Sequence, residues 1–493
     1  MALALFTRTR PRMPRPPDAA TPRTGFRAAP VPGRRRRGLL FRNELKALLG
    51  LAGPIIVSQL GGIAMTTTDT IMVAGLGPGA LAAAGIGTSI HVVTLMLMSG
   101  TVMGMGPLVS QAFGAGDRAE CRRLLVQGVW LAALLAIPVT IISLLGGKIA
   151  LALGQDPEVS KQAGAFMAAL APGLLPMLLF TAMRQYLDSM SMPRVAMTIM
   201  FVGIVVNVFG NLALIHGVGG VIPPLGLAGS ALSTSIVRWT MVFVLGGWLL
   251  SRTDLSPVGV VPLRAQAARM KRIVAVGIPV GTQMTAEVGI FSLAAVMMGW
   301  LGPVQLAAHQ VTINLASATF MVALGASIAG AIRVGQHVGA RNPRAVHRAA
   351  LGTYVVAMGF MSLCALLFLL APRFLIGLYT DDPGIMRYGT ALLFLAAVFQ
   401  LFDGAQVAGV HVLRGAADTR VPMAITILGY WGVGIPVAYW LGFHTPLEHR
   451  GVWAGLSVSL AVVGAMLAWR VRLVVWKRPL APRAGMPAHG GLS

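Results

Sequence analysis

The sequence predicts an all-α polytopic membrane protein with twelve transmembrane helices in two six-helix, pseudo-symmetric lobes. Three observations support this fold class. Hydrophobic residues make up 56% of the 493 residues and charged residues only 11%, whereas a soluble domain carries roughly 25% charged residues. Apolar windows of about 20 residues, long enough to span a bilayer as a helix, recur along most of the chain. The second half of the chain also repeats landmarks of the first.

The apolar windows place the twelve spans along the chain. We expect them at about 48–74, 81–110, 124–146, 162–183, 195–216, 226–250, 273–301, 306–332, 349–371, 388–413, 421–443 and 451–474. A transmembrane β-barrel is excluded, because its strands alternate in polarity over about 10 residues. The apolar runs here are continuous and about twice that length.

The distribution of basic residues predicts the orientation. The net charge is +24, and Lys and Arg concentrate in alternate connections and in the two tails. The other connections hold only Lys148, Lys161, Arg373, Arg387 and Arg450. Cytoplasmic connections of membrane proteins carry an excess of Lys and Arg, so we expect both termini in the cytoplasm. This one-sided distribution accounts for the net charge, so no nucleic-acid partner is expected.

The same map predicts the organisation of the chain. We expect a disordered basic cytoplasmic tail at 1–44, an N-lobe at 45–251, a cytoplasmic linker at 252–272, a C-lobe at 273–476 and a cytoplasmic tail at 477–493. Met13 is an alternative translation start.

The two halves share landmarks at a nearly constant offset. A shift of 225 residues aligns Pro54 with Pro279 and Gln111 with Gln336. The turn at 114–117 aligns with 339–342, and a shift of 226 aligns Arg194 with Arg420. Each half has an even number of spans, so the repeats are parallel in topology, with a cleft expected between two lobes.

Three acidic residues lie within apolar spans: Asp69, Glu287 and Asp403. A carboxylate at bilayer depth costs about 2.5–3.5 kcal/mol on insertion scales. The repeat gives none of the three an acidic counterpart, since they correspond to Ala294, Gly62 and Met177. We therefore interpret them as ion- and substrate-handling groups of a secondary transporter.

In the first lobe, Asp69 follows Thr68 in an unusually polar stretch of the first span. Asn207 and Asn211 are four residues apart and so share one helix face. Together these groups predict a proton or Na⁺ site. The alternative is that the two asparagines only join helices through hydrogen bonds.

In the second lobe, Glu287 and Asp403 form the predicted pair, which would bind a proton or Na⁺ and attract a cationic substrate. Polar neighbours such as Gln283 and Gln400 are candidate contributors, whereas His309 is either a proton relay or a packing residue. Asp188, at the cytoplasmic end of its span, is expected to be solvated. No nucleophile–base pair or metal-ligand spacing is evident, so neither an enzyme nor a cofactor is expected.

Several motifs resemble the multidrug and toxic compound extrusion (MATE) family, specifically its bacterial NorM-like branch. They are the segment 68–75, the segment 307–311, the turn 333–335, and 413–415 followed by Asp418. The resemblance covers about residues 45–476. It implies a V-shaped twelve-helix antiporter in the bacterial inner membrane, exporting lipophilic organic cations in exchange for inward H⁺ or Na⁺. We expect a monomer.

The resemblance also implies roles for single residues. Asp69 matches the first-lobe acid implicated in cation coupling, with Asn207 and Asn211 facing it. Glu287 and Asp403 match second-lobe acids implicated in Na⁺ binding. The aromatic position four before Asp403 is a tyrosine in some Na⁺-coupled relatives but Phe399 here, which removes an oxygen. H⁺ and Na⁺ both remain open, as do two alternative functions, a lipid-linked precursor flippase and a passive channel.

Overall fold

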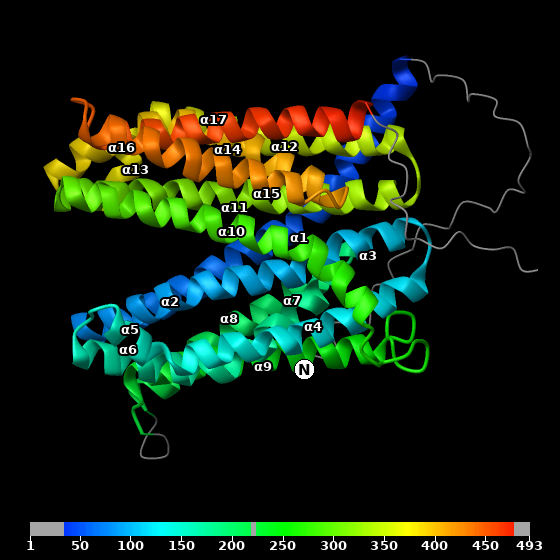
Figure 1. Ribbon diagram of the computed structural model, residues 1–493, viewed down its shortest axis with the longest axis horizontal. Coiled ribbons are helices and arrows are strands. Elements are labelled where there is room, and N and C mark those ends of the chain that lie inside the picture. Colours follow the sequence, from blue (N-terminus) through cyan, green and yellow to red (C-terminus); the bar gives the residue numbers. More distant parts are fainter. Residues whose placement is uncertain (1–33, 218–222, 478–493) are drawn as a thin grey trace, which may run out of the picture. The chain divides into compact units, whose positions relative to one another are not determined.

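The computed structural model describes residues 34–217 and 223–477, which are almost entirely helical (Figure 1). Within this part, twelve helices are long and apolar enough to cross a membrane. They are Gly38–Ala74, Gly79–Gly114, Arg118–Leu144, Pro157–Ser189, Pro193–His216, Gly226–Ser251, Ala267–Leu301, Pro303–Gly339, Pro343–Leu370, Pro383–Gly415, Arg420–Phe443 and His449–Trp476. The predicted twelve-helix membrane fold is confirmed.

The first six spans form the N-lobe. Its elements are α1 (Arg34–Ala74), α2 (Pro78–Met103), α3 (Met105–Gly114), α4 (Arg118–Leu144), α5 (Gly146–Ala152), α6 (Pro157–Leu170), η2 (Ala171–Gly173), α7 (Leu174–Ser189), α8 (Pro193–His216) and α9 (Gly226–Ser251). The helix α1 already begins at Arg34. Residues 34–44 are therefore helical, although the sequence places them in a disordered tail; residues 1–33 of that tail lie outside the described residues.

The last six spans form the C-lobe. Its elements are α10 (Ala267–Leu301), α11 (Pro303–Gly339), α12 (Pro343–Leu370), α13 (Pro372–Gly377), α14 (Pro383–Gly415), α15 (Arg420–Ile427), η3 (Leu428–Gly434), α16 (Ile435–Phe443), α17 (His449–Val471) and η4 (Arg472–Lys477). The predicted tail from residue 478 onward lies outside the described residues.

The repeated turn adopts the same backbone in both lobes. Asp117 accepts a hydrogen bond from the amide of Glu120 at 2.8 Å, and its counterpart Asn342 accepts one from the amide of Ala345 at 3.1 Å. Each therefore caps the N-terminus of the helix that follows. The residue before each cap has a positive φ, 80° at Gly116 and 53° at its counterpart Arg341. A non-glycine residue in this conformation is uncommon, so the repeat extends to the local backbone.

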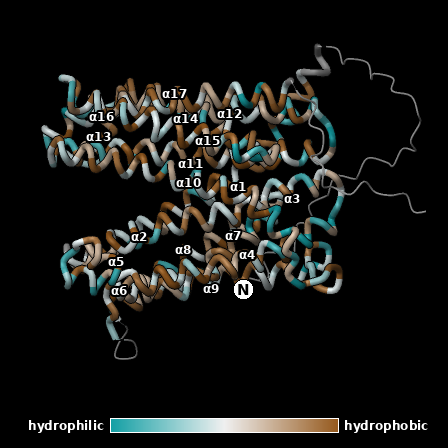
Figure 2. The backbone as a smooth tube through the Cα atoms, viewed as in Figure 1, coloured by the Kyte–Doolittle hydropathy of each residue, from teal (hydrophilic) through white to brown (hydrophobic). Residues whose placement is uncertain are grey.

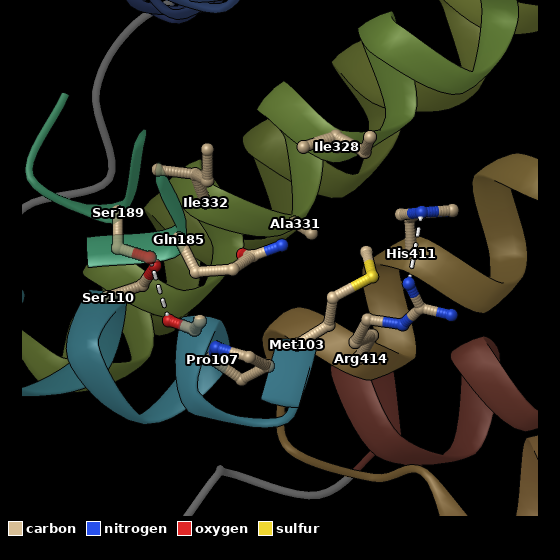
Figure 3. A pocket seen from close by; sticks show the side chains of 11 residues that line it. Met103, Pro107, Ser110, Gln185, Ser189, Ile328, Ala331, Ile332, His411 and Arg414 are labelled. Atoms are coloured by element: carbon tan, nitrogen blue, oxygen red, sulfur yellow. Dashed lines mark hydrogen bonds between the residues drawn. The ribbon is translucent and has the colours of Figure 1, made fainter. Parts of the chain in front are cut away.

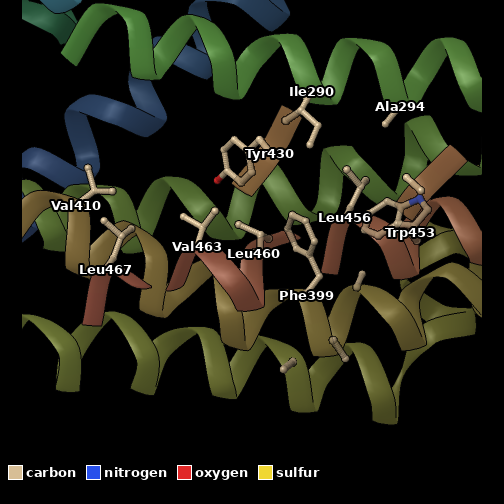
Figure 4. Packing of buried hydrophobic residues seen from close by; sticks show 14 of the residues in the cluster. Ile290, Ala294, Phe399, Val410, Tyr430, Trp453, Leu456, Leu460, Val463 and Leu467 are labelled. Carbon is tan, nitrogen blue, oxygen red and sulfur yellow. The ribbon is translucent and has the colours of Figure 1, made fainter. Parts of the chain in front are cut away.

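Each lobe has its own apolar core. Trp453 is the largest fully buried side chain, and it lies in the C-lobe cluster with Phe399 and Tyr430 (Figure 4). A second cluster, which includes Tyr186 and Met105, fills the N-lobe. Hydrophobic residues cover most of each helix, and hydrophilic ones gather toward the helix ends (Figure 2). This pattern matches a protein whose helices lie in a bilayer.

The lobes meet through small residues. Gly100 on α2 and Gly104, the residue that joins α2 to α3, face Gly281 and Gly277 on α10. A Cβ atom at any of the four positions would overlap backbone of the opposite segment. Two glycines spaced four apart on each helix allow the close approach seen in small-residue membrane interfaces. We call the end of the bundle where α4, α8, α10, α12 and α15 begin the basic end, because arginines lie in or near the first turn of each of these helices.

Candidate functional site

Asp69 on α1 is held by the two predicted asparagines on α8. Its Oδ1 accepts a hydrogen bond from Asn211 Nδ2 at 2.6 Å and another from Asn207 Nδ2 at 2.9 Å. Both asparagines are fully buried, while Asp69 is half-buried. The spacing of four residues on α8 therefore places both amides against one carboxylate oxygen.

The second oxygen of Asp69 faces α9. Thr234 Oγ1 lies 3.4 Å from Asp69 Oδ2 and also donates to the carbonyl of Ser230 at 3.1 Å. Arg238, one turn further along α9, is close enough for its charge to act on Asp69. Neither Thr234 nor Arg238 was among the predicted site residues. Their only sequence signal was a polar run at 233–235, followed by an arginine inside a span.

Thr68 does not join this cluster. Its Oγ1 donates to the carbonyl of Ala64 on its own helix at 2.9 Å. A hydroxyl bonded to the preceding turn contributes to the helix rather than to a neighbouring carboxylate. The polar character of the segment around Asp69 is therefore largely internal to α1.

The cluster also contains amide oxygens that make no hydrogen bond in the described chain. The Oδ1 atoms of Asn207 and Asn211 are buried, with no hydrogen-bond partner within the described chain. With the Asp69 carboxylate and the Thr234 hydroxyl they make a set of hard oxygen donors of the kind that alkali and alkaline-earth ions prefer. The described residues hold no group of three or more His, Cys, Asp or Glu side chains suited to a metal ion. A cation here would therefore depend on amide and hydroxyl oxygens as well as the carboxylate.

The two C-lobe acids lie on different helices and act on each other. Glu287 is half-buried on α10, and Asp403 is buried on α14. The two carboxyl groups lie near each other, and the buried hydroxyl of Tyr430 lies near both. Arg414, buried near the end of α14, places a positive charge near Glu287. The structure thus brings the predicted acids together and adds two residues that were not predicted.

Tyr430 owes its position to an irregular segment. Residues Leu428–Gly434 form a π-helical turn between α15 and α16, and such turns are rare and frequent at functional sites. Trp431 in the same turn donates from Nε1 to the carbonyl of Ala286 at 3.1 Å, one residue before Glu287. The π turn therefore fixes two aromatic side chains beside the acid on α10.

The remaining predicted contributors have packing contacts. His309 Nδ1 accepts a hydrogen bond from Trp453 Nε1 at 3.1 Å, and the Phe399 ring lies 5.6 Å from the Trp453 ring. Gln400 donates to Thr319 Oγ1. Gln283 is buried one turn before Glu287 on α10. Of the two readings of His309, these contacts favour packing.

A small cavity lies between the lobes near the basic end. It has a volume of about 30 Å³, enough to hold a water molecule. Ser110, Gln185 and Ser189 line it from the N-lobe, and His411 and Arg414 line it from the C-lobe (Figure 3). Arg414 NH1 lies 3.4 Å from His411 Nε2. The α14 helix therefore carries polar groups from Asp403 down to the contact between the lobes.

Asp188 does not lie in the environment that the sequence predicts for it. The sequence places it in solvent, but it is buried, with 4% of its surface exposed, and pairs with Arg184 at 3.4 Å. Arg184 also donates to Gln59 Oε1 at 3.0 Å. The end of α7 packs against other helices at the basic end, so a helix end there is not automatically solvated.

Comparisons with known proteins identify relatives of this chain. The MatE family model matches residues 54–213 and 279–440, one segment in each lobe. A probable multidrug resistance protein NorM from Mesorhizobium japonicum is 35% identical over 440 residues, covering 87% of this chain and 94% of that protein. The multidrug resistance protein NorM from Burkholderia vietnamiensis is 36% identical over 439 residues, covering 88% and 95%.

Solved structures share the fold at low sequence identity. A eukaryotic MATE transporter superposes with a TM-score of 0.80 at 22% identity, covering 90% of this chain and 98% of its own. An outward-facing multidrug resistance transporter of the MOP superfamily superposes with a TM-score of 0.80 at 20% identity, covering 89% and 97%. The two-lobe arrangement is thus shared with experimentally determined transporters.

Proposed function

This chain belongs to the MatE family, and on that premise we propose that it exports lipophilic organic cations across the bacterial inner membrane by antiport with H⁺ or Na⁺. Its relatives named NorM are multidrug resistance proteins, which favours drug export over a lipid-precursor flippase or a passive channel. We propose that both termini lie in the cytoplasm, because basic residues concentrate in the tails and in the connections on that side. We also propose that the protein is a monomer.

The observation that carries the proposal is the environment of Asp69. Two buried amides donate to one of its oxygens, an arrangement that stabilises a carboxylate carrying its charge. The other oxygen faces the Thr234 hydroxyl. A charged acid kept in an apolar lobe by neutral donors is suited to bind and release a small cation.

Either coupling ion is compatible with this chemistry. A proton would bind at the Asp69 carboxylate, at the oxygen that faces the Thr234 hydroxyl. A sodium ion would instead use the carboxylate with the unpartnered Oδ1 atoms of Asn207 and Asn211. In both cases ion binding neutralises Asp69.

The C-lobe acids supply the attraction for substrate. Glu287 and Asp403 repel each other when both are charged, so a cationic drug between the lobes relieves that repulsion. A proton or Na⁺ at the same acids would do so as well. The two cations therefore compete, and competition of this kind gives antiport when each ligand binds the two conformations with different affinity.

The test is transport by purified protein in proteoliposomes. Efflux of a fluorescent organic cation is measured with a pH gradient alone, with a Na⁺ gradient alone and with neither. We expect one gradient to drive efflux in the wild type and Asp69→Asn to abolish it while the protein stays folded. Gradient-driven efflux by Asp69→Asn at the wild-type rate would refute the role of Asp69. Equal flux with and without gradients would instead indicate a channel.

A further inference from the structure

Two glutamines that the repeat aligns, Gln111 and Gln336, bridge the lobes near the basic end. Gln111 on α3 donates from Nε2 to the carbonyl of Gly415, at the end of α14, at 3.1 Å. Gln336 on α11 donates from Nε2 to the carbonyl of Ser189, at the end of α7, at 3.0 Å. The 226-residue shift aligns Ser189 with Gly415, so the two bonds are pseudo-symmetric equivalents. We infer that this glutamine pair is the gate that holds the lobes closed at the basic end.

The backbones at this contact have no room for side chains. A Cβ atom at Gly114 would overlap the carbonyl of Gln336, and one at Gly339 would overlap the carbonyl of Gln111. The two glycines are themselves equivalent under the 225-residue shift. Each helix end therefore places its glycine against the glutamine of the other lobe. Both glutamine side chains are buried at this reciprocal contact.

Gln336 connects the gate to an ion-pair cluster between the lobes. Its Oε1 accepts from Arg333 NH1 at 3.1 Å, and Arg333 in turn forms a two-point pair with Glu44 on α1 at 2.8 and 2.9 Å. His337 Nε2 lies 3.0 Å from the same carboxylate. The glutamine, the arginine and the glutamate therefore form one continuous chain of bonds from α7 to α1.

A second ion pair crosses at the other side of the gate. Arg269 on α10 pairs with Glu120 on α4 at 3.0 Å. The 225-residue shift aligns Arg269 with Glu44. The first helix of each lobe therefore carries a charged residue at the same repeat position, acidic in α1 and basic in α10, and each of these residues pairs with the other lobe. Arg269 and Glu120 are 32% and 19% exposed at the side chain, so water competes for this pair more than for the buried Gln111 and Gln336. The two glutamine bonds, together with the Glu44–Arg333 pair, must therefore break before the lobes separate here.

This inference rests on the proposed function, because alternating access requires the basic end to open when substrate enters from that side. In the closed form each glutamine has a carbonyl partner on the other lobe. In an open form water takes the place of that partner. Loss of one amide donor removes the bond only from the closed form, so it raises the open population, by about fivefold per lost bond.

The experiment measures the separation of the lobes directly and needs no gradient or substrate. Spin labels are placed at two exposed basic-end positions, Arg118→Cys and Arg344→Cys, in a background lacking Cys121 and Cys364. Distances are measured by double electron–electron resonance in lipid nanodiscs. The variants are Gln111→Met, Gln336→Met and the double substitution, which keep side-chain size and remove the donor. The matched control is Gln162→Met, which removes a half-buried glutamine at the opposite end of the N-lobe.

We expect a longer-distance population to grow in both single variants and further in the double variant, with Gln162→Met unchanged. The increase should be larger for Gln336→Met, because the Gln336 amide also donates to Ser191 Oγ at 2.8 Å and accepts from Arg333. Thermal unfolding identifies any variant that fails to fold. If a Met variant does not fold, Gln→Glu at the same position, which also removes the amide donor, is measured in its place. Distance distributions identical to wild type in all folded variants would overturn the gate. Failure of the wild type to transport would refute the proposed function instead and leave the distance result standing.

Discussion

Asp69 and Asn211 are joined by a 2.6 Å hydrogen bond between α1 and α8, the shortest of the three contacts that hold this carboxylate. The donor is an amide and the acceptor an acid, so the bond favours the charged form of Asp69. The same asparagine has a buried Oδ1 with no partner in the described residues. The amide nitrogen of Asn211 therefore disfavours protonation of Asp69, whereas its amide oxygen is available to a metal ion.

This double role lets Asn211→Ala distinguish the two coupling ions. If H⁺ is the coupling ion, loss of the donor makes the charged acid less stable, so half-maximal transport moves to higher pH by about one unit. If Na⁺ is the coupling ion, loss of an oxygen ligand raises the half-saturating Na⁺ concentration about tenfold. Proteoliposome efflux over a range of pH and Na⁺ concentrations measures both shifts.

The matched control for this variant is Thr68→Ala. Its hydroxyl bonds to its own helix, so its removal should leave both dependences at the wild-type values. An Asn211→Ala protein with wild-type dependence on both ions would contradict a coupling role for this asparagine.

Neutralising a C-lobe acid should weaken substrate binding. We expect Glu287→Gln and Asp403→Asn each to lower the affinity for a permanently charged organic cation about tenfold, because each removes one of two interacting negative charges. Asp381→Asn, at an exposed acid in the connection before α14, is the control and should bind normally. Fluorescence titration of purified protein in detergent measures the affinity. Unchanged binding by both acid variants would place the substrate elsewhere.

The glycine contact between α2 and α10 should be intolerant of even one methyl group. Gly281→Ala places a Cβ atom against the backbone of Leu97, and overpacking of this kind costs about 1–3 kcal/mol. We expect a lower midpoint of thermal unfolding in detergent. Gly247→Ala is the control, since nothing lies within 4 Å of its added Cβ and alanine favours the helix. A Gly281→Ala protein as stable as wild type would show that the helices can separate at no cost.

Hydropathy and internal repetition were sufficient to predict the twelve helices and the two lobes, because both signals extend over tens of residues. The cluster of Asp69, Asn207 and Asn211 was also predictable. A spacing of four residues fixes a shared helix face, and an acid inside a span requires polar neighbours. The part of the site that depended on local periodicity was therefore visible in the sequence.

The partners contributed by helix packing were not visible. Arg414 was expected just beyond the end of its span, but α14 continues to Gly415 and buries it. Tyr430 lies near the acids on a π turn, and such a turn leaves no hydropathy signal. The short helices α5 and α13 were missed for a related reason: each has fewer than two turns, whereas span prediction averages over about 20 residues.

The Glu44–Arg333 pair should stabilise the closed contact more than an exposed pair can. Glu44 is 8% and Arg333 19% exposed at the side chain, and the pair makes two bonds. Removing either partner leaves the other partly buried and uncompensated. We therefore expect Glu44→Gln and Arg333→Gln each to lower the unfolding midpoint, and the double variant to be no less stable than the worse single one. The control cycle uses Arg252 and Asp254, which are 47% and 44% exposed and should show almost no coupling. Additive losses at Glu44 and Arg333 would mean that the two residues act independently, and that this pair does not hold the lobes together.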